Sequence, residues 1–409
     1  MDAADAARRL LSARAVRERA HRMLALAREE KLTHWRLDEA ALPGIVDRVV
    51  ATTRAAYPDL DIPFHARWRH FVVEGEDWWD EGERHTLFAD AAERARCEID
   101  LAVVSVLLDA GAGPDWRYES ARGPVLRRSE GLAIASLEMF EDGVFSTSAK
   151  DEWRADAAGL TAIDAAQLSD GFKVSPTNPL IGLEGRAALL NALGRVVAAR
   201  PSVFARHDVP RPGGLYDHFR RLTRGAPLPA ETILETVLAH FGPIWPSRLE
   251  LGGVALGDCW RHPAIVTDDP TSGLVPFHKL SQWLTYSLIE PLRRGGIEVV
   301  DIDALTGLPE YRNGGLLMDG GALILRDPDA ATRPHAPGDE LIVEWRALTV
   351  ALLDEIAVAM RARLGMDATT LPLAKVLQGG TWTAGREIAR EKRADGGPPL
   401  VIASDGTVF

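Results

Sequence analysis

Apolar residues recur at helical spacing along most of the chain, which predicts a mainly α fold. The patterns predict helices at 2–30, 38–57, 83–111, 125–141, 183–200, 230–240, 344–364 and 373–393. Short apolar runs predict only a few β-strands, one of them in a hairpin near Leu400 to Val408. We expect one compact domain over residues 1–409, in which 1–160 form an N-terminal helical layer and 161–409 the catalytic core.

The segment from Pro276 to Leu292 is apolar on nearly all sides, as in a buried helix. At helical spacing Lys279, Gln282, Trp283 and Tyr286 share one face. Because an unpaired ammonium is costly to bury, Lys279 needs a carboxylate, a substrate or a lowered pKa. Two interpretations are open: a functional lysine, or one that reaches water or pairs with a structural acid.

The charge balance points to a small-molecule partner. The chain carries 47 basic and 59 acidic residues, a formal net charge of −12, whereas a nucleic-acid-binding protein needs a basic face. Two distant cysteines, Cys97 and Cys259, indicate a reducing compartment and no zinc site. We see no signal peptide and no membrane-spanning run, so we expect a cytoplasmic protein without membrane contact. The oligomeric state stays open.

Polar groups follow Lys279 at three places. Glu310, Tyr311 and Arg312 lie between Pro309 and a glycine pair, where sites often occur, although a turn with an internal Glu–Arg pair is equally expected. Asp319 precedes Gly320-Gly321, which is also common turn chemistry. Glu344 and Arg346 open a predicted helix, where an acid suits the helix dipole and Arg346 is either its partner or an anion contact.

Other signals are weak or missing. The loop from Lys173 to Arg186 precedes a helix start that suits a phosphate, but it has no Walker or GxGxxG spacing. We find no HExxH, GxSxG or EF-hand pattern, and His278 lacks metal-ligand spacing. We therefore expect no metal and no cofactor. Hydrolysis by carboxylates with help from a lysine is the chemistry best supplied.

Five long segments resemble the uracil-catabolism protein 4 family, whose members belong to a uracil-degradation pathway. They are NPLIGLEGRAALL (178–190), GLVPFHKLSQWLTYSL (273–288), LTGLPEYRNGGLLMD (305–319), VEWRALTVALLDEIA (343–357) and LAKVLQGGTWTAGREIA (373–389). The resemblance covers most of the chain.

A more distant resemblance concerns the order of three motifs. Queuosine-salvage nucleotide hydrolases carry FYKRAQ-like, DYRVPQ and EIR-type motifs, and this chain has FHKLSQ from Phe277, EYRN from Glu310 and EWR from Glu344. The resemblance implies a helical fold similar to helix-hairpin-helix DNA glycosylases and cleavage of an N-glycosidic bond. It also implies Glu310 as catalytic carboxylate, in place of Asp, and Lys279 as the buried lysine.

These observations lead to a functional hypothesis. We expect a hydrolase that releases urea or a related ureido compound from a ribosyl or phosphoribosyl group, with Glu310 and Lys279 as catalytic residues. The residues expected to bind substrate are His278, Gln282, Trp283, Tyr286, Tyr311, Arg312, Asp319, Glu344 and Arg346. Two alternatives remain: a non-catalytic binding or scaffold protein of the pathway, and a nucleic-acid glycosylase, which the acidic charge disfavours.

Overall fold

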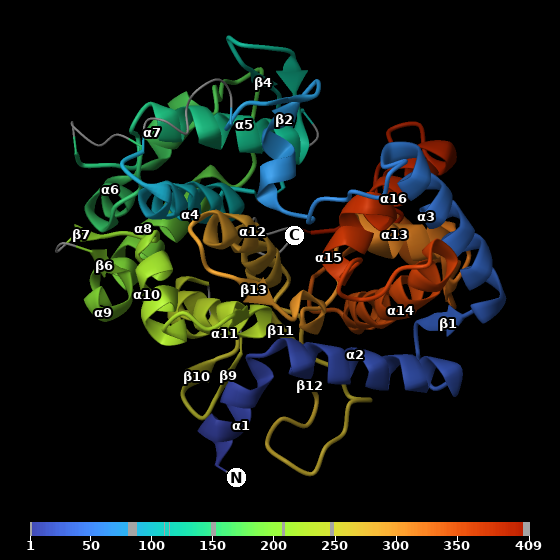
Figure 1. Cartoon of the computed structure of the whole chain (residues 1–409). Helices are drawn as coiled ribbons and strands as arrows, with labels where there is room; N and C mark the ends of the chain where they lie inside the picture. Colours follow the sequence, from blue (N-terminus) through green and yellow to red (C-terminus); the bar gives the residue numbers. More distant parts are fainter. Residues whose placement is uncertain are drawn as a thin grey trace. The chain divides into compact units, whose positions relative to one another are not determined.

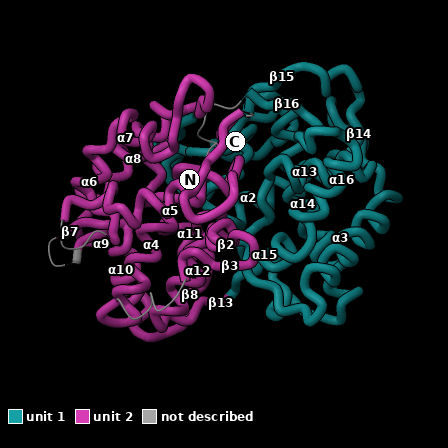
Figure 2. The backbone as a smooth tube through the Cα atoms, turned by 90° about the horizontal axis from the view of Figure 1, so that it is seen from above, with its two compact units in different colours: residues 1–65, 247–282, 301–404 teal, residues 66–246, 283–300, 405–409 magenta. Residues whose placement is uncertain are grey.

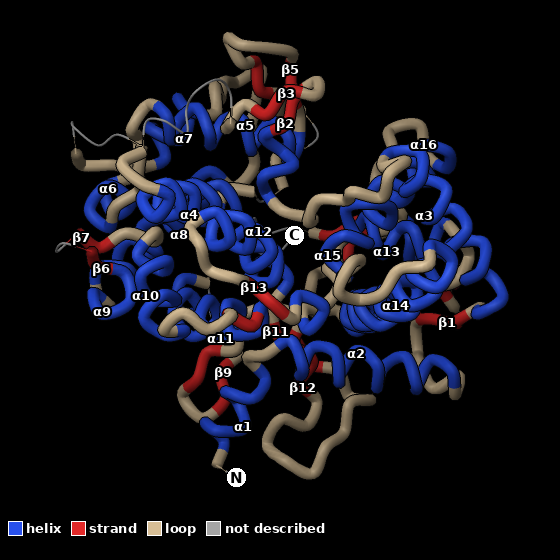
Figure 3. Tube along the Cα trace, in the orientation of Figure 1, coloured by secondary structure: helices blue, strands red, loops and turns tan. Residues whose placement is uncertain are grey.

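The computed structural model describes residues 2–80, 88–109, 111–113, 115–148, 153–206, 209–245 and 249–403. Helices carry most of these residues, whereas the strands are two or three residues long and pair only in twos (Figure 3). The expected mainly α fold class with a few short strands is confirmed. The likeness to DNA glycosylases stays a prediction.

The chain divides into two compact units, each built from separate stretches (Figure 2). Unit 1 comprises residues 1–65, 247–282 and 301–404, and unit 2 comprises 66–246, 283–300 and 405–409. The division falls inside helix α12 (Lys279–Arg294), between Gln282 and Trp283. A single domain with layers that meet near residue 160 stays a prediction.

Unit 1 is organised around helix α14, which is buried along most of its length (Figure 1). Helices α2, α3 and α13 pack against it, and α16 packs against α13. The helical elements of unit 1 are α1 (Ala3–Leu10), α2 (Ala13–Arg28), η1 (Glu39–Ala41), α3 (Leu42–Ala56), η5 (Ile302–Ala304), α13 (Tyr311–Asp319), η6 (Pro328–Thr332), α14 (Glu340–Leu364), α15 (Leu373–Val376), the π-helical η7 (Leu377–Thr381) and α16 (Trp382–Lys392). A helix that is apolar on all sides, as α14 is, belongs in a core.

The strands of unit 1 form four pairs. They are β1 (Trp35–Leu37) with β14 (Leu323–Leu325), β9 (Glu250–Leu251) with β10 (Val254–Ala255), β11 (Cys259–Arg261) with β12 (Leu274–Pro276), and β15 (Pro334–His335) with β16 (Val401–Ile402). The last pair is parallel and the others are antiparallel. Strand β16 thus forms as expected but pairs with β15, and the second strand of the expected hairpin lies outside the described residues.

Unit 2 is built around helix α4, whose residues from Ala95 to Leu107 are buried. The helical elements are η2 (Arg67–Phe71), α4 (Ala91–Leu107), α5 (Arg128–Glu141), α6 (Ala157–Ala162), α7 (Ala165–Gly171), α8 (Leu183–Ala198), α9 (Pro201–Phe204), α10 (Gly214–Thr223), α11 (Ala230–Phe241) and η4 (Gly242–Ile244). Its strands are β2 (Val72–Val73) with β3 (Glu76–Asp77), β4 (Tyr118–Glu119) with β5 (Val125–Leu126), β6 (Ala205–Arg206) with β7 (Val209–Pro210), and β8 (Leu228–Pro229) with β13 (Val299–Val300).

The prediction of one long helix at 2–30 is wrong in one respect, because two helices, α1 and α2, form in its place. Ser12 has extended backbone geometry, and its side chain accepts the N–H of Ala15 as the N-cap of α2. A serine at this position competes with continued helix by capping a new one. The apolar pattern alone does not reveal this break.

One further boundary differs from expectation. Helix α12 begins at Lys279, because Pro276 ends β12 and His278 takes a left-handed backbone with φ +50°. Glycines 314 and 315 lie within the short helix α13. A Cβ at Gly314 would come within 2.7 Å of the Trp345 ring, so glycine allows α13 and α14 to approach closely.

Candidate functional site

Glu310 lies at the N-cap of α13, where the sequence placed it on a loop. Its Oε2 accepts the backbone N–H of Arg312 and its Oε1 that of Asn313, both at 2.7 Å. Desolvation raises the pKa of Glu310, and the two N–H groups, Lys279 and Arg312 lower it without cancelling that rise. The carboxyl group is half-buried. A carboxyl group whose pKa is shifted by its surroundings is typical of a functional acid or base.

Lys279 is the first residue of α12 and is half-buried. Its ammonium lies close enough to Glu310 to lower the pKa of that carboxyl group. Both residues belong to unit 1. The two residues expected to be catalytic therefore interact electrostatically within unit 1.

Gln282 connects the start of α12 to the loop before Glu310. Its Oε1 accepts the backbone N–H of Thr306 at 2.9 Å, and its Nε2 donates to the Phe277 carbonyl at 3.3 Å. The side chain is fully buried. Gln282, expected to bind substrate, thus holds the loop that carries Glu310.

Asp258 is a half-buried carboxylate that sequence reasoning missed. Both of its oxygens accept from the Arg346 guanidinium at 2.8 Å, and they also accept from the Trp260 indole and the Lys279 backbone N–H. Burial would raise the pKa of Asp258, but Arg346 and these hydrogen bonds hold it well below its ordinary value. The only local signal was an acid between Gly257 and an apolar strand, which is common turn chemistry.

Arg346 and His278 complete this arrangement. The guanidinium of Arg346 is 1% exposed and lies 4.1 Å from the Phe277 ring centroid. His278 is buried, and its Nε2 donates to the Leu10 carbonyl at 2.9 Å. Burial lowers the pKa of His278, which favours the neutral form of the ring. Both residues were expected to bind substrate. In the structure His278 immediately precedes α12, and Arg346 lies against the nearby Phe277 ring.

Glu344 lies in a buried hydrogen-bonding cluster instead of the first turn of its helix, because α14 begins four residues earlier at Glu340. Its carboxylate accepts the backbone N–H groups of Thr33 at 3.3 Å and His34 at 3.1 Å. His262 Nε2 lies 3.2 Å from the same carboxylate. Glu344 thereby ties the chain before β1 to the core helix of unit 1.

Replacing Glu344 with glutamine is expected to lower the free energy of unfolding by about 1–3 kcal/mol, because one of two fully used acceptor oxygens becomes a donor. Unfolding in guanidinium chloride measures this loss. Glu340→Gln, at the exposed start of the same helix, is the matched control and should change stability by less than about 0.5 kcal/mol. Equal effects of the two substitutions would contradict the structural role of Glu344.

Asp319, Tyr311 and Arg312 lie on α13. Asp319 pairs with Arg393 through two hydrogen bonds of 2.8 and 2.5 Å. Arg312 is buried, donates to the Gly396 carbonyl at 3.2 Å, and its guanidinium lies 4.7 Å from the Tyr311 ring centroid. A Cβ at Gly385 would come within 2.3 Å of the Arg312 carbonyl, so α16 presses directly on this part of α13.

Trp283 and Tyr286 belong to unit 2. The Trp283 ring contacts the buried Arg67 guanidinium at 5.5 Å and the His70 ring edge-on at 5.7 Å. Tyr286 is fully buried. Their expected role in binding substrate stays a prediction.

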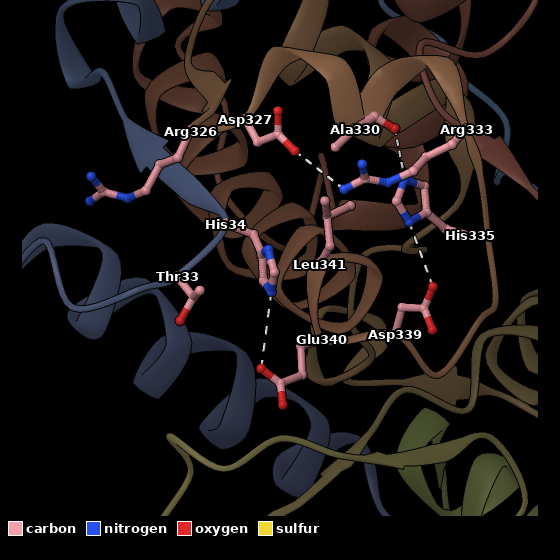
Figure 4. Close-up of a pocket in the computed structure, with 10 residues that line it drawn as sticks. All are labelled: Thr33, His34, Arg326, Asp327, Ala330, Arg333, His335, Asp339, Glu340 and Leu341. Atoms are coloured by element: carbon pink, nitrogen blue, oxygen red, sulfur yellow. Dashed lines mark hydrogen bonds and ion pairs between the residues drawn. The ribbon is translucent and has the colours of Figure 1, made fainter.

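A cavity of about 480 Å³ opens in unit 1 at the start of α14 (Figure 4). Two pairs of side chains in its lining contact each other. Arg333 donates to Asp327 at 3.2 Å, and His335 lies 3.6 Å from Asp339. The described residues that line it include none of those predicted for the site. Because Arg333 and His335 have acidic partners and Arg326 donates to backbone carbonyls, the cavity does not indicate a particular ligand.

The structure does not support a phosphate contact from Arg186. The side chain is 1% exposed, and its guanidinium donates to the carbonyls of Leu108, Gly111 and Ile181. An arginine committed to backbone carbonyls fixes the loop before α8. Helix α8 itself begins at Leu183 after Gly182, as the sequence predicted.

No group of three His, Cys, Asp or Glu side chains among the described residues is arranged to hold a metal ion. None of the helices that the structure describes combines the length and apolar character needed to cross a membrane.

Comparison with known proteins places the chain in a family. Protein urg3 of Schizosaccharomyces pombe is 39% identical over 98% of both chains, and uracil catabolism protein 4 of Lachancea kluyveri is 36% identical over 92% of both. A family model described as protein of unknown function (DUF1688) matches residues 9–409. The resemblance drawn from the five motifs is therefore confirmed, and the chain belongs to the DUF1688 family together with uracil catabolism protein 4.

Proposed function

We propose that this protein acts in uracil degradation as a hydrolase that cleaves the N-glycosidic bond of a ribosylurea-like substrate. The name of the relative from Lachancea kluyveri supports the pathway. The observation that supports this reaction is the half-buried Glu310 carboxyl group, whose pKa is lowered by the positive charge of Lys279 and raised by desolvation. A lysine and a carboxylate with a perturbed pKa are the groups that such a hydrolysis uses.

The reaction breaks the bond between the anomeric carbon and a ureido nitrogen. Positive charge develops on the sugar ring, so the Glu310 carboxylate stabilises it and takes a proton from the attacking water. The water oxygen bonds to the anomeric carbon, the bonding electron pair leaves with the nitrogen, and the Lys279 ammonium delivers a proton to that nitrogen. The proton that Glu310 takes from water then restores the ammonium. The products are the free sugar and urea. Lys279 donates a hydrogen bond to the departing ureido group.

The direct test is to incubate the purified protein with ribosylurea and, separately, with its 5′-phosphate, and to measure urea release. We expect release from one of the two substrates, and the comparison shows whether the phosphate is required. A folded protein that releases urea from neither would contradict the proposed function.

The pH dependence of kcat/KM is expected to report Glu310. Water activation needs the ionised carboxylate, so activity should rise with pH through a pKa above the ordinary glutamate value of about 4.3. Because Lys279 lowers the pKa of Glu310, Lys279→Met should move this rise to higher pH. Lys375→Met, which removes a lysine on α15, should leave it in place. A rise that shifts equally in both variants would contradict the pairing.

A further inference from the structure

Asp258 clamps the backbone immediately before and at Lys279. Its carbonyl accepts the N–H of Phe277 at 2.8 Å and that of His278 at 3.3 Å. Its Oδ2 accepts the N–H of Lys279 at 3.0 Å. Three consecutive backbone amides are therefore held by one residue, through its main chain and its side chain.

The clamp itself is rigid. The Asp258 carboxylate is fixed by two hydrogen bonds from Arg346, both of 2.8 Å, and by one from the Trp260 indole at 2.8 Å. Arg346 in turn covers the ring of Phe277, a residue that the clamp holds. A bidentate arginine pair fixes both the position and the orientation of a carboxylate.

The clamped segment has an unfavourable backbone conformation. His278 adopts φ +50°, which residues other than glycine rarely take. Such conformations persist where the surroundings over-determine them, and they cluster at functional sites. Here the surroundings are the Asp258 carbonyl and the Leu10 carbonyl, which accepts from the His278 ring. The turn at His278 places Lys279 at the first position of α12.

We propose that Asp258 is a positioning residue that fixes Lys279 relative to Glu310 through this clamp. The inference rests on the proposed function, because Lys279 must have a catalytic role for its position to matter. It predicts that Asp258 acts on turnover only through Lys279. A residue that acts through another loses its effect once that other residue is gone.

A double-mutant cycle on urea release tests this coupling. Asp258→Asn keeps the size of the side chain, and we expect it to lower kcat by up to about 100-fold with little change in KM. In a chain that already carries Lys279→Met, Asp258→Asn should lower kcat by less than about threefold further. Additive losses in the double variant would overturn the proposal.

Asp354 supplies the matched control. It is another half-buried acid of unit 1 that pairs with an arginine, Arg17, through contacts of 2.9 and 3.3 Å. Asp354→Asn should lower stability in a similar way, and its effect on kcat should be equal with and without Lys279. Thermal unfolding of each variant shows that the compared proteins are folded.

A second measurement does not depend on substrate. The chain has only six lysines, so reductive methylation with a ¹³C label gives few NMR signals, and Lys279→Met identifies that of Lys279. Asp258→Asn should move the Lys279 signal, whereas Asp354→Asn should not. A Lys279 signal unmoved by Asp258→Asn overturns the clamp. If the signal moves but wild-type protein releases no urea, the positioning holds and the proposed reaction fails.

Discussion

Glu310→Gln is expected to lower kcat for urea release by about 10²- to 10⁴-fold, the usual contribution of a general base. Glutamine has nearly the same shape, but it cannot take a proton from water or stabilise the cationic transition state. KM should change much less, because the carboxylate acts on the transition state more than on the bound substrate. Steady-state kinetics on ribosylurea or its 5′-phosphate measures both constants.

The control for this variant must separate catalysis from helix capping. Glutamine has one acceptor oxygen where the carboxylate uses two, so the cap of α13 weakens by about 0.5–2 kcal/mol. Glu310→Asp keeps the charge with a shorter arm and should retain more activity than Glu310→Gln at similar stability. Full activity of Glu310→Gln would show that another group activates water.

Arg346→Met is expected to destabilise unit 1 by up to about 3–5 kcal/mol, because it leaves the Asp258 carboxylate, whose side chain is only 13% exposed, without its countercharge. The methionine side chain still fills the space over Phe277, so the loss of charge dominates the effect. Unfolding in guanidinium chloride measures it. Arg363→Met is the control, because Arg363 pairs with Asp47 at the surface and should contribute about 0–1 kcal/mol.

The stability difference between wild type and Arg346→Met is expected to depend on pH. The pKa of Asp258 is depressed in the folded protein, so its stabilising effect is present above the unfolded pKa of about 3.9. That effect is lost as the pH falls through the folded pKa. The stability difference between wild type and Arg346→Met should therefore shrink below about pH 4. A difference that stays constant from pH 7 to pH 3 would contradict the ion pair as its cause.

Periodicity predicted the helices well where the apolar pattern runs without interruption, as for α3, α11 and α14. It failed where a single side chain decides the boundary. Ser12 ends one helix by capping the next, and Glu310 starts α13 by capping it in spite of two glycines. Local hydrogen bonds to backbone amides outweigh the helix propensities of neighbouring residues at such points.

The candidate site was partly predictable for a related reason. Lys279 and Glu310 could be found because a lone lysine on an apolar helix and a polar group after proline are unusual in themselves. Asp258 could not, since its partner Arg346 lies 88 residues away and nothing local indicates the pair. The hydrogen bonds of Glu344 could not be predicted for the same reason, because its partners Thr33 and His34 come from the other end of the chain.

The way unit 1 is assembled has a consequence for synthesis of the protein. Strand β1 near residue 35 pairs with β14 near residue 325, and α14 packs on α2. Unit 2 has nearly all of its chain once residue 300 has left the ribosome, whereas unit 1 must wait for residues 301–404. Domains generally fold as soon as their chain is available. The N-terminal helices therefore emerge first but complete their packing only after residues 301–404 have been made, and until then their apolar faces lack their partners.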